Sequence, residues 1–306
     1  QDQFNASYYR DYNAIAQRRV WYSKKSPEIS SNKTLSWICK EKKTGKIIGH
    51  FGIIPAKLKH KHNQNTVVWG RDLIVLPEFR SLGIGPFLVD SVLKDIKEES
   101  SLFLVAGGND QICSMYKNLG FTDLGLIPLY VRILRVDGIL KKKFPARLAA
   151  GLLNLFNMAL SIQNFKKNSR ETIIEEVSSF DDSFNELWLG ASRYIPVIAS
   201  RDSAFLKWRF VDGPIRDYKI FKAVDRARKR TLGYIILREG KSRGLNVGII
   251  CDIFASPGDT GSILSLANFA VKYFKDKKTI DLIRCNILHK DFGHALKRLG
   301  FIPTRS

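Results

Sequence analysis

The chain has 306 residues, of which 44% are hydrophobic and 26% charged, and its formal net charge is +21 at pH 7. These proportions are typical of a globular protein and exclude an intrinsically disordered chain, while the length predicts two domains of about 150 residues each. The positive charge favours anionic partners such as nucleic acid, acidic lipid or phosphorylated small molecules, and it does not choose among them.

The cysteines are scattered, with neither a CxxC pair nor the spacing of metal ligands: Cys39, Cys113, Cys251 and Cys285. A chain of this size needs no disulfide bonds, so we expect reduced thiols and a cytoplasmic protein. The sequence contains no signal peptide and no uncharged apolar run of about 20 residues. It opens at Gln1 without a methionine, which predicts that residues are missing upstream.

The first third of the chain alternates between helical and strand-like residue patterns. We expect helices at 8–19, 87–97 and 111–119, and strands at 35–40, 46–54, 57–62, 67–75 and 102–105. The order of strand, helix, strand and helix from 67 onward predicts a parallel pair of strands within an α/β sheet.

Residues 138–170 differ in character, because lysines flank an apolar segment at 148–162 that two asparagines interrupt. This segment is too short and too polar to span a bilayer. Two interpretations stay open. It is either a plain helix that connects two domains, or an interfacial helix that makes a peripheral contact with an acidic membrane.

The pattern of the first half begins again near Thr172. Three landmarks recur with unchanged spacing, since Asp72, Pro77 and Gly120 become Asp252, Pro257 and Gly300. The strand-like segments KIIGHF and LGYII also correspond. We therefore expect a duplicated unit, with one domain at 1–137, a connecting region at 138–170 and a second domain at 171–306.

The segment 73–93 carries the strongest functional signal. After an apolar strand, Arg80 opens a turn that contains Gly83 and Gly85 and leads into an amphipathic helix, whose first turn suits Pro86. Glycines let the backbone approach a ligand, and N–H groups at a helix start bind anions, so a pyrophosphate fits this turn. Arg80 would add charge and a fork of donors. Taken alone, the turn is also compatible with a plain strand–helix connection.

A second motif follows after the next strand, where Asn109 precedes a helix that carries Tyr116 and ends at Gly120 and Phe121. Together, Arg80-Ser81-Leu82-Gly83-Ile84-Gly85 and Tyr116-Lys117-Asn118-Leu119-Gly120-Phe121 resemble the (R/Q)-x-x-G-x-(G/A) and Y-x-x-x-G-F motifs of the GNAT superfamily of acyl-CoA-dependent N-acyltransferases. The resemblance is strong over 46–125 and weaker over 1–45.

The resemblance implies an α/β fold with two tandem GNAT-like domains, each a mixed, mostly antiparallel twisted sheet flanked by helices. It also implies acetyl-CoA as the cofactor. The strand after Glu99 would splay away to admit the pantetheine arm, beside Gly107 and Gly108. The implied cofactor-binding residues are Leu73, Ile74, Val75, Arg80, Ser81, Leu82, Gly83, Ile84, Gly85, Asn109 and Tyr116.

By the same resemblance, Tyr116 would lie near the thioester sulfur and protonate the leaving thiolate. A phenol of pKa about 10 can do so for a thiolate of pKa about 8.5–10. The alternative is a tyrosine that only packs in the core. Asp72 is the first candidate for the general base and Asp110 the second, although the counterpart of Asp72, Asp252, leaves a structural role open. Glu78 is expected to face solvent.

The second half keeps the scaffold and lacks the motif residues, because Thr260, Ile263, Ser265 and Leu296 stand where Arg80, Gly83, Gly85 and Tyr116 would map. A β-carbon at the glycine positions would crowd a backbone that must approach phosphate. We expect a degenerate domain that shapes the acceptor pocket, with a second cofactor site as the alternative.

The segments 208–214 and 130–132 resemble those of tandem acyltransferases of bacterial cell-surface sugar biosynthesis. The expected acceptor is thus the amine of a small molecule such as an amino sugar or nucleotide sugar, followed by a peptide or amino-acid amine. Two rivals stay open: a non-catalytic basic module that binds nucleic acid or a membrane surface, and an aminoacyl transferase on a tandem GNAT-like fold. The intact motif disfavours both, and with them a nucleic-acid partner.

Other polar and aromatic residues predict no further site. His60 and His62 lack a third ligand, so no metal site is expected. The basic residues at 226–230 suit an exposed hairpin turn, and the alternative is a contact with an anion or a membrane. Trp21, Trp69 and Trp208 are expected in the core.

Overall fold

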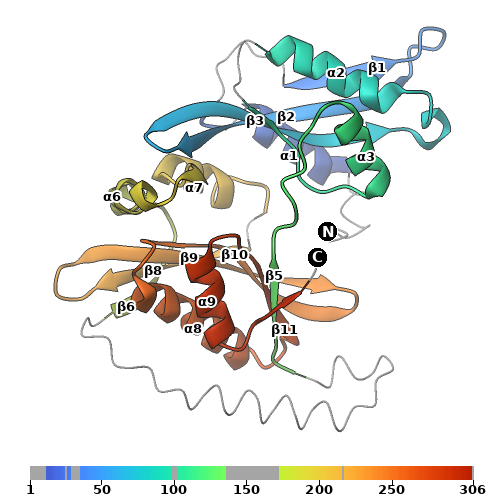
Figure 1. Ribbon diagram of the computed structural model, residues 1–306. Helices are drawn as coiled ribbons and strands as arrows, with labels where there is room; N and C mark the ends of the chain where they lie inside the picture. Colours follow the sequence, from blue (N-terminus) through green and yellow to red (C-terminus); the bar gives the residue numbers. More distant parts are fainter. Residues whose placement is uncertain are drawn as a thin grey trace. The chain divides into compact units, whose positions relative to one another are not determined.

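The computed structural model describes residues 12–24, 26–28, 35–97, 102–135, 172–215 and 217–304 (Figure 1). The whole connecting region 138–170, including the segment at 148–162, lies outside the described residues. The chain forms two compact units. The first contains the described residues up to Gly125 together with Ile195–Pro214, and the second contains Leu126–Tyr194 and the chain from Ile215 onward.

The helices and strands expected between residues 64 and 119 are present in the first unit, whereas its first helix extends to Lys24 and the elements at 197–199 and 203–210 were not expected. The elements of this unit are α1 (Tyr12–Lys24), β1 (Ser36–Lys40), β2 (Ile47–His60), β3 (Asn63–Val75), the short 3₁₀ helix η1 (Pro77–Phe79), α2 (Ile84–Ile96), β4 (Leu102–Leu104), α3 (Asp110–Asn118), β7 (Val197–Ala199) and α7 (Ser203–Phe210). The segment at 57–62, expected as a separate strand, is instead the end of β2. Its chain reverses at Lys61, which has a φ of 55°, and leads directly into β3.

The sheet of the first unit has the order β1-β2-β3-β4, and β7 pairs with the end of β2. Strands β1, β2 and β3 are antiparallel, whereas β3 and β4 form the predicted parallel pair. Helix α2 buries Leu88, Val89 and Val92 against Phe51 and Val68 of the sheet. Gly49 makes this close packing possible, because a β-carbon there would stand 3.0 Å from side-chain atoms of α2.

Two irregularities of β3 shape the middle of this sheet. The register with β2 shifts between His50 and Gly52, which leaves a bulge at Asp72, whose φ is 50°. Bulges bend a strand and re-aim its side chains, and they are common next to active sites. The pairing of β3 with β4 is confined to Val67–Trp69, so the rest of β3 pairs with β2 alone in the described part of the chain.

The second unit repeats this plan around a longer sheet. Its elements are β5 (Leu129–Ile133), β6 (Thr172–Val177), α6 (Asp182–Ala191), the 3₁₀ helix η2 (Ser192–Tyr194), β8 (Lys219–Asp225), β9 (Arg230–Ser242), β10 (Leu245–Ala255), α8 (Thr260–Asp276), β11 (Leu282–Asn286), α9 (Lys290–Arg298) and β12 (Ile302–Thr304). The strand order is β12-β5-β11-β10-β9-β8-β6, and β10 and β11 are parallel as β3 and β4 are. Helix α8 packs on this sheet through buried residues such as Leu266, Ala270 and Phe274.

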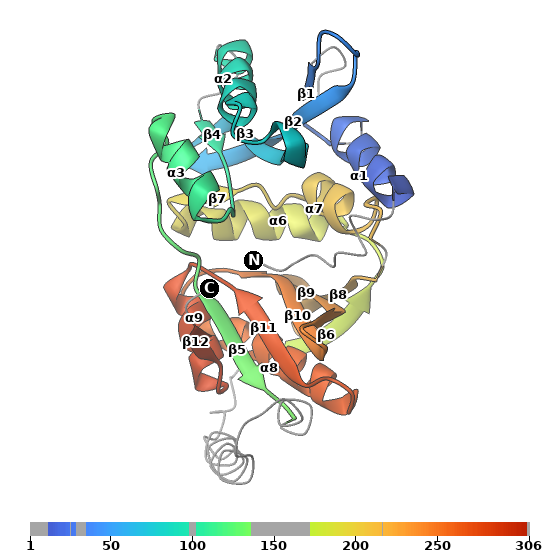
Figure 2. The same ribbon diagram turned by 90° about the vertical axis from the view of Figure 1, so that its right-hand side faces the viewer.

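The two units exchange segments. Strand β5, which follows the first unit in sequence, lies between β11 and β12 of the second, as the green strand beside the red ones in Figure 2 shows. In return, α7 brings Trp208 onto Trp21 of α1, with ring centroids 4.8 Å apart. Each indole N–H donates to the backbone carbonyl of the other tryptophan, at 3.0 and 3.5 Å. No sequence pattern predicted this exchange.

Candidate functional site

The turn before α2 lies open at the surface. Ser81 and Gly83 have φ angles of 68° and 76°, in the left-handed region that favours glycine. A β-carbon built at Gly83 would meet nothing within 4 Å. Gly83 is also the N-cap of α2, and no side chain caps the helix there.

The main-chain donors of this turn are unused. The N–H groups of residues 82–85 donate to no residue in the described part of the chain, and the first bond of α2 runs from the Phe87 N–H to the Gly83 carbonyl. Unpaired amides at a helix start, together with the positive end of the helix dipole, attract anions. Nε of Arg80 donates to the Val75 carbonyl at 3.1 Å, which holds a positive charge beside the turn.

The predicted separation of the two central strands is present. Leu73, Ile74 and Val75 lie on β3 beyond its pairing with β4. Ile74 and Val75 pair with β2, and no described strand pairs with the other edge of this segment. Gly108 has a φ of 143°, and a β-carbon there would approach the Ile112 side chain to 2.8 Å. This glycine therefore allows the chain after β4 to turn away from β3.

A groove of about 510 Å³ runs along α3 beside the start of α2. Its lining residues are Pro86, Asp110, Gln111, Ser114, Met115, Asn118 and Leu119. Asp110, the second candidate for the base, thus lies at this groove. Asn109 caps α3, since its Oδ1 accepts a hydrogen bond from the Ile112 N–H at 3.0 Å. That bond occupies the side-chain oxygen of Asn109, one of the residues that the resemblance assigned to cofactor binding.

Tyr116 lies on α3 with 8% of its surface exposed. Its ring packs against Phe121, with centroids 4.9 Å apart, and its hydroxyl makes no hydrogen bond with any described residue. Burial raises the pKa of Tyr116 to about 12. The phenol therefore stays protonated at neutral pH and can donate a hydrogen bond to a ligand that reaches it.

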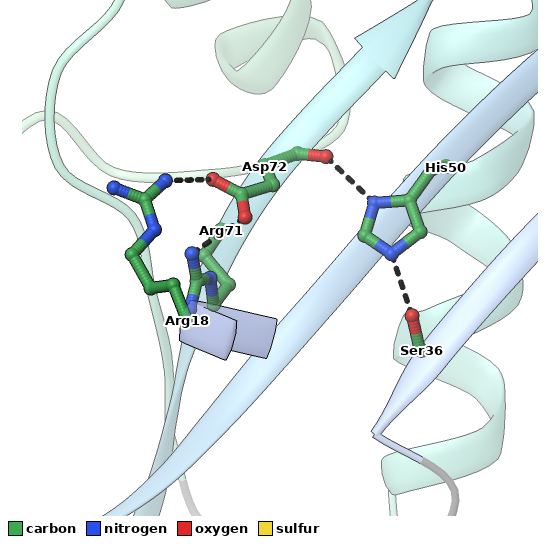
Figure 3. Close-up of polar contacts among 5 residues, drawn as sticks. All are labelled: Arg18, Ser36, His50, Arg71 and Asp72. Carbon is green, nitrogen blue, oxygen red and sulfur yellow. Dashed lines mark hydrogen bonds and ion pairs between the residues drawn. The ribbon is translucent and has the colours of Figure 1, made fainter. Parts of the chain in front are cut away.

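Asp72 is held by two arginines in the bulge of β3 (Figure 3). Its Oδ1 accepts from Arg18 Nη2 at 3.3 Å and its Oδ2 from Arg71 Nη2 at 2.5 Å. The guanidinium of Arg71 also stacks on Tyr22 of α1 at 3.3 Å from the ring centroid. The Asp72 carboxylate is thus the counter-charge of two largely buried guanidiniums. The geometry favours a structural role for Asp72 over that of a base.

His50 and Ser36 form a polar pair that the sequence analysis missed. In Figure 3, Nδ1 of His50 lies 3.0 Å from the Asp72 carbonyl oxygen, and its Nε2 lies 2.6 Å from Oγ of Ser36. Burial lowers the pKa of His50 below 6.5. The only signal in the sequence was the alignment of KIIGHF with LGYII, in which the second half of the chain has a tyrosine at the position of this histidine.

Glu78 faces solvent, as predicted, and forms an exposed ion pair with Lys46 at 3.0 Å. A hydrogen bond from its own backbone N–H and the bond from Lys46 lower the pKa of Glu78. Trp21 and Trp208 are buried, as expected for core residues.

The start of α8 in the second unit is closed to anions. Helix α8 begins at Thr260, the position of Arg80, so the residues that form the open turn in the first unit are helical here. The carboxylate of Asp259 accepts from the Ser262 N–H at 3.1 Å. The Gly258 N–H donates to Oδ2 of Asp291 at 3.2 Å. Leu296, 1% exposed, replaces Tyr116.

No group of three or more histidine, cysteine, aspartate or glutamate side chains is placed to hold a metal ion in the part of the chain that the structure describes. Among the same residues, no helix combines the length and apolar character that crossing a membrane requires.

Comparison with solved structures identifies the fold. Two structures of Saccharomyces cerevisiae N-myristoyltransferase with bound myristoyl-CoA match with TM-scores of 0.62 and 0.59, at 13% and 12% identity. They cover 94% and 90% of this chain, and 68% and 69% of the enzyme. A GCN5-related N-acetyltransferase from Anabaena variabilis matches with a TM-score of 0.58 at 14% identity, over 84% of this chain and 57% of that protein.

Sequence comparison points the same way. No curated protein sequence is significantly similar to the chain. The sequence profile of the Acetyltransferase (GNAT) family matches residues 2–121, which contain the open turn, the separated strands and Tyr116. Residues 2–121 are therefore similar to the Acetyltransferase (GNAT) family, and the described part of the chain has the tandem GNAT-like fold seen in N-myristoyltransferase.

Proposed function

We propose that this protein transfers an acetyl group from acetyl-CoA to the amine of a small acceptor, such as an amino sugar or nucleotide sugar used in cell-surface polysaccharide biosynthesis. The observation that carries the proposal is the open turn before α2. Its unused N–H groups at 82–85 suit a diphosphate, and Arg80 supplies charge beside them. The open edge of β3 offers backbone groups to an extended pantetheine arm.

In this proposal, the acceptor amine attacks the thioester carbonyl and the thiolate of coenzyme A leaves. Tyr116 would stabilise that thiolate with a hydrogen bond. Outright proton transfer from Tyr116 is unfavourable, because its pKa of about 12 lies above the value of about 8.5 for a free thiol. A proton that reaches the thiolate would therefore come from elsewhere in the site or from solvent.

The preference for a phosphorylated or sugar-linked acceptor rests on charge. A net charge of +21 attracts anionic substrates and raises their rate of encounter. The softer resemblance at 208–214 also supports it. We place the reaction in the cytoplasm, where acyl-CoA and nucleotide sugars would meet.

A longer acyl donor is the second candidate, and one observation favours it: the N-myristoyltransferase structures that cover 90% and 94% of this chain contain myristoyl-CoA. Against it, aromatic rings fill the interior next to Tyr116. Phe103 and Phe121 pack with centroids 5.7 Å apart, and Phe51 lies 6.0 Å from Phe103. We therefore expect a short acyl group.

Calorimetric titration tests the proposal. Acetyl-CoA should bind the wild-type protein, and Arg80→Ala should weaken binding by about 1.5–3 kcal/mol, the usual size of a hydrogen bond to a charged group. Myristoyl-CoA serves as the matched ligand, and tighter binding of the long chain would favour the second candidate. No heat from either ligand would favour a non-catalytic module instead.

A further inference from the structure

We propose that Ser36 and His50 form a proton relay, in which Ser36 Oγ receives a proton from the acceptor amine and passes its own proton to Nε2 of His50. This inference rests on the proposed function. It supplies a general base other than Asp72, whose carboxylate is bound by two arginines.

The hydrogen bonds of His50 determine its tautomer. A carbonyl oxygen can only accept, so the bond to the Asp72 carbonyl at 3.0 Å requires a proton on Nδ1. The lone pair then lies on Nε2, where it accepts from the Ser36 hydroxyl at 2.6 Å. An imidazole oriented through Nδ1 and presenting Nε2 is the arrangement in which histidine acts as a general base.

The bulge of β3 creates the acceptor for Nδ1. Asp72 has a φ of 50°, and its carbonyl oxygen meets the ring of His50 on the neighbouring strand. Gly52 lies directly across from Ser36 on β2, so no side chain separates the hydroxyl from the ring. Ser36 is itself exposed, and a substrate amine can reach its oxygen.

The surroundings of His50, burial above all, favour a neutral ring. Burial and the positive charges of Arg19 and Arg71 lower its pKa, and they outweigh the carbonyl bond and the charge of Asp72, which raise it. Arg18 belongs to the same cluster through its ion pair with Asp72. A neutral imidazole at pH 7 is able to take up a proton during the reaction.

The second half of the chain serves as an internal control. When the bulges of β3 and β10 are matched, Ile74 corresponds to Phe254. Their partners on the neighbouring strands, His50 and Tyr234, then correspond to each other. One strand further, Ser36 aligns with Ile220, because the two lie opposite Gly52 and Ile236. Tyr234 is fully buried, with its hydroxyl bonded to Asp252 at 2.7 Å, and Ile220 is 5% exposed.

The residues that the second half keeps differ in role from those that it has lost. Asp72 persists as Asp252 in the half that has lost the anion-binding turn and Tyr116, so this aspartate follows the scaffold. Ser36 and His50 are replaced in the same half by Ile220, which has no polar side-chain group, and by Tyr234, which is fully buried with its hydroxyl bonded to Asp252. Ser36 and His50 therefore follow the reaction site, as Arg80, Gly83 and Tyr116 do.

The proposed step balances. The neutral amine nitrogen forms a bond to the acetyl carbon, and the carbon–sulfur bond of the thioester breaks. One amine proton moves to Ser36 Oγ while the hydroxyl proton moves to Nε2 of His50. The imidazolium later returns a proton through solvent to the thiolate, so the products are an amide and coenzyme A as its thiol.

Four variants test the relay: His50→Gln, Ser36→Ala, Ser36→Thr and, as a control, His60→Gln at an exposed histidine on the same strand. Acetyl-CoA binding is measured by calorimetry. Turnover is measured as thiol release with glucosamine, a nucleotide-linked amino sugar, an amino-acid amide and water as nucleophiles. We expect His50→Gln to lower turnover by about 10²–10⁴-fold with unchanged affinity for acetyl-CoA, which is the usual range for general base catalysis. Ser36→Thr should retain activity that Ser36→Ala loses.

Two signatures distinguish a relay from a structural role. The acidic limb of the pH–rate profile should titrate below 6.5 in the wild-type protein and vanish in His50→Gln. Nitrogen NMR of the imidazole should show the Nδ1–H tautomer. The relay alone would be wrong if His50→Gln bound acetyl-CoA and turned over as fast as the wild-type protein. An Nε2–H tautomer of His50 would contradict it as well. If the protein did not bind acetyl-CoA, or bound it but released no thiol with any of the four nucleophiles, the proposed function would be wrong and the relay with it.

Discussion

Helices α2 and α8 follow the central strands of the two halves, and they begin at different positions relative to those strands. Helix α2 begins at Ile84, after an open turn with unused N–H groups, whereas α8 begins at Thr260 and draws the equivalent residues into its first turns. The carboxylates of Asp259 and Asp291 then accept hydrogen bonds from the N–H groups of Ser262 and Gly258. A carboxylate at a helix start satisfies the same amides that a phosphate would need, and it repels the phosphate.

One scaffold can therefore carry or lose an anion site through a few residues at a helix start. The sheets, the bulges and the Gly-Phe motif after the second helix persist in both halves. Folding constrains those features, whereas ligand binding constrains the turn. Duplication thus helps to distinguish functional residues from structural ones within a single sequence.

The largest effect is expected on stability, at the contact between α7 and α1. Trp208→Ala should destabilise the first unit by about 3–5 kcal/mol, the usual cost of truncating a buried aromatic residue, although Trp208 belongs to the second half of the sequence. Urea unfolding followed by hydrogen exchange of β2 and β3 would measure this. Trp188→Ala, at a tryptophan equally buried in the second unit, is the control. If Trp208→Ala left exchange in β2 and β3 unchanged, the segment exchange would not stabilise the first unit.

Replacing Gly83 by isoleucine, the residue at the equivalent position of the second half, should close the anion site. Gly83→Ile places a β-branched side chain at a φ of 76°, where the left-handed conformation costs on the order of 1–3 kcal/mol. We expect acetyl-CoA affinity to fall by at least tenfold in calorimetry. Gly45→Ile, in a hairpin turn with a φ of 70°, introduces the same strain away from the site. Equal loss of affinity in both variants would mean that strain, not the turn, was responsible.

Tyr116→Phe should lower turnover by about tenfold, the value of one hydrogen bond of about 1.4 kcal/mol, with little change in acetyl-CoA affinity. Because the pKa of Tyr116 is about 12, the wild-type phenol stays protonated between pH 6 and 10. The ratio of wild-type to variant turnover should therefore be constant over this range in a thiol-release assay. A ratio that fell with rising pH would show that Tyr116 ionises in this range and transfers its proton.

The smallest effect concerns the cap of α8. Asp259→Ala should lower the free energy of unfolding by about 1 kcal/mol, as loss of an N-cap does, and it should not create a second acetyl-CoA site because the turn remains helical. Denaturation and the calorimetric stoichiometry would report the two results. A stoichiometry of two would show that the carboxylate alone excludes the cofactor from the second half.

Much of this protein follows from the sequence. The alternation of apolar residues predicted the central strands and the two helices after them, because that periodicity is local. The unchanged spacing from Asp72 to Gly120 and from Asp252 to Gly300 revealed the duplication. The glycines around Arg80 indicated the anion-binding turn, since a backbone that approaches phosphate leaves a direct trace in composition.

Only the tertiary structure decided the rest, because those features depend on contacts between residues far apart in the chain. The insertion of β5 between β11 and β12 and the stacking of Trp208 on Trp21 join segments that no local pattern relates. Asp72 became a partner of two arginines only when α1 packed near β3. His50 met Ser36 through strand register, which pairing and the bulge determine and single-residue identity does not.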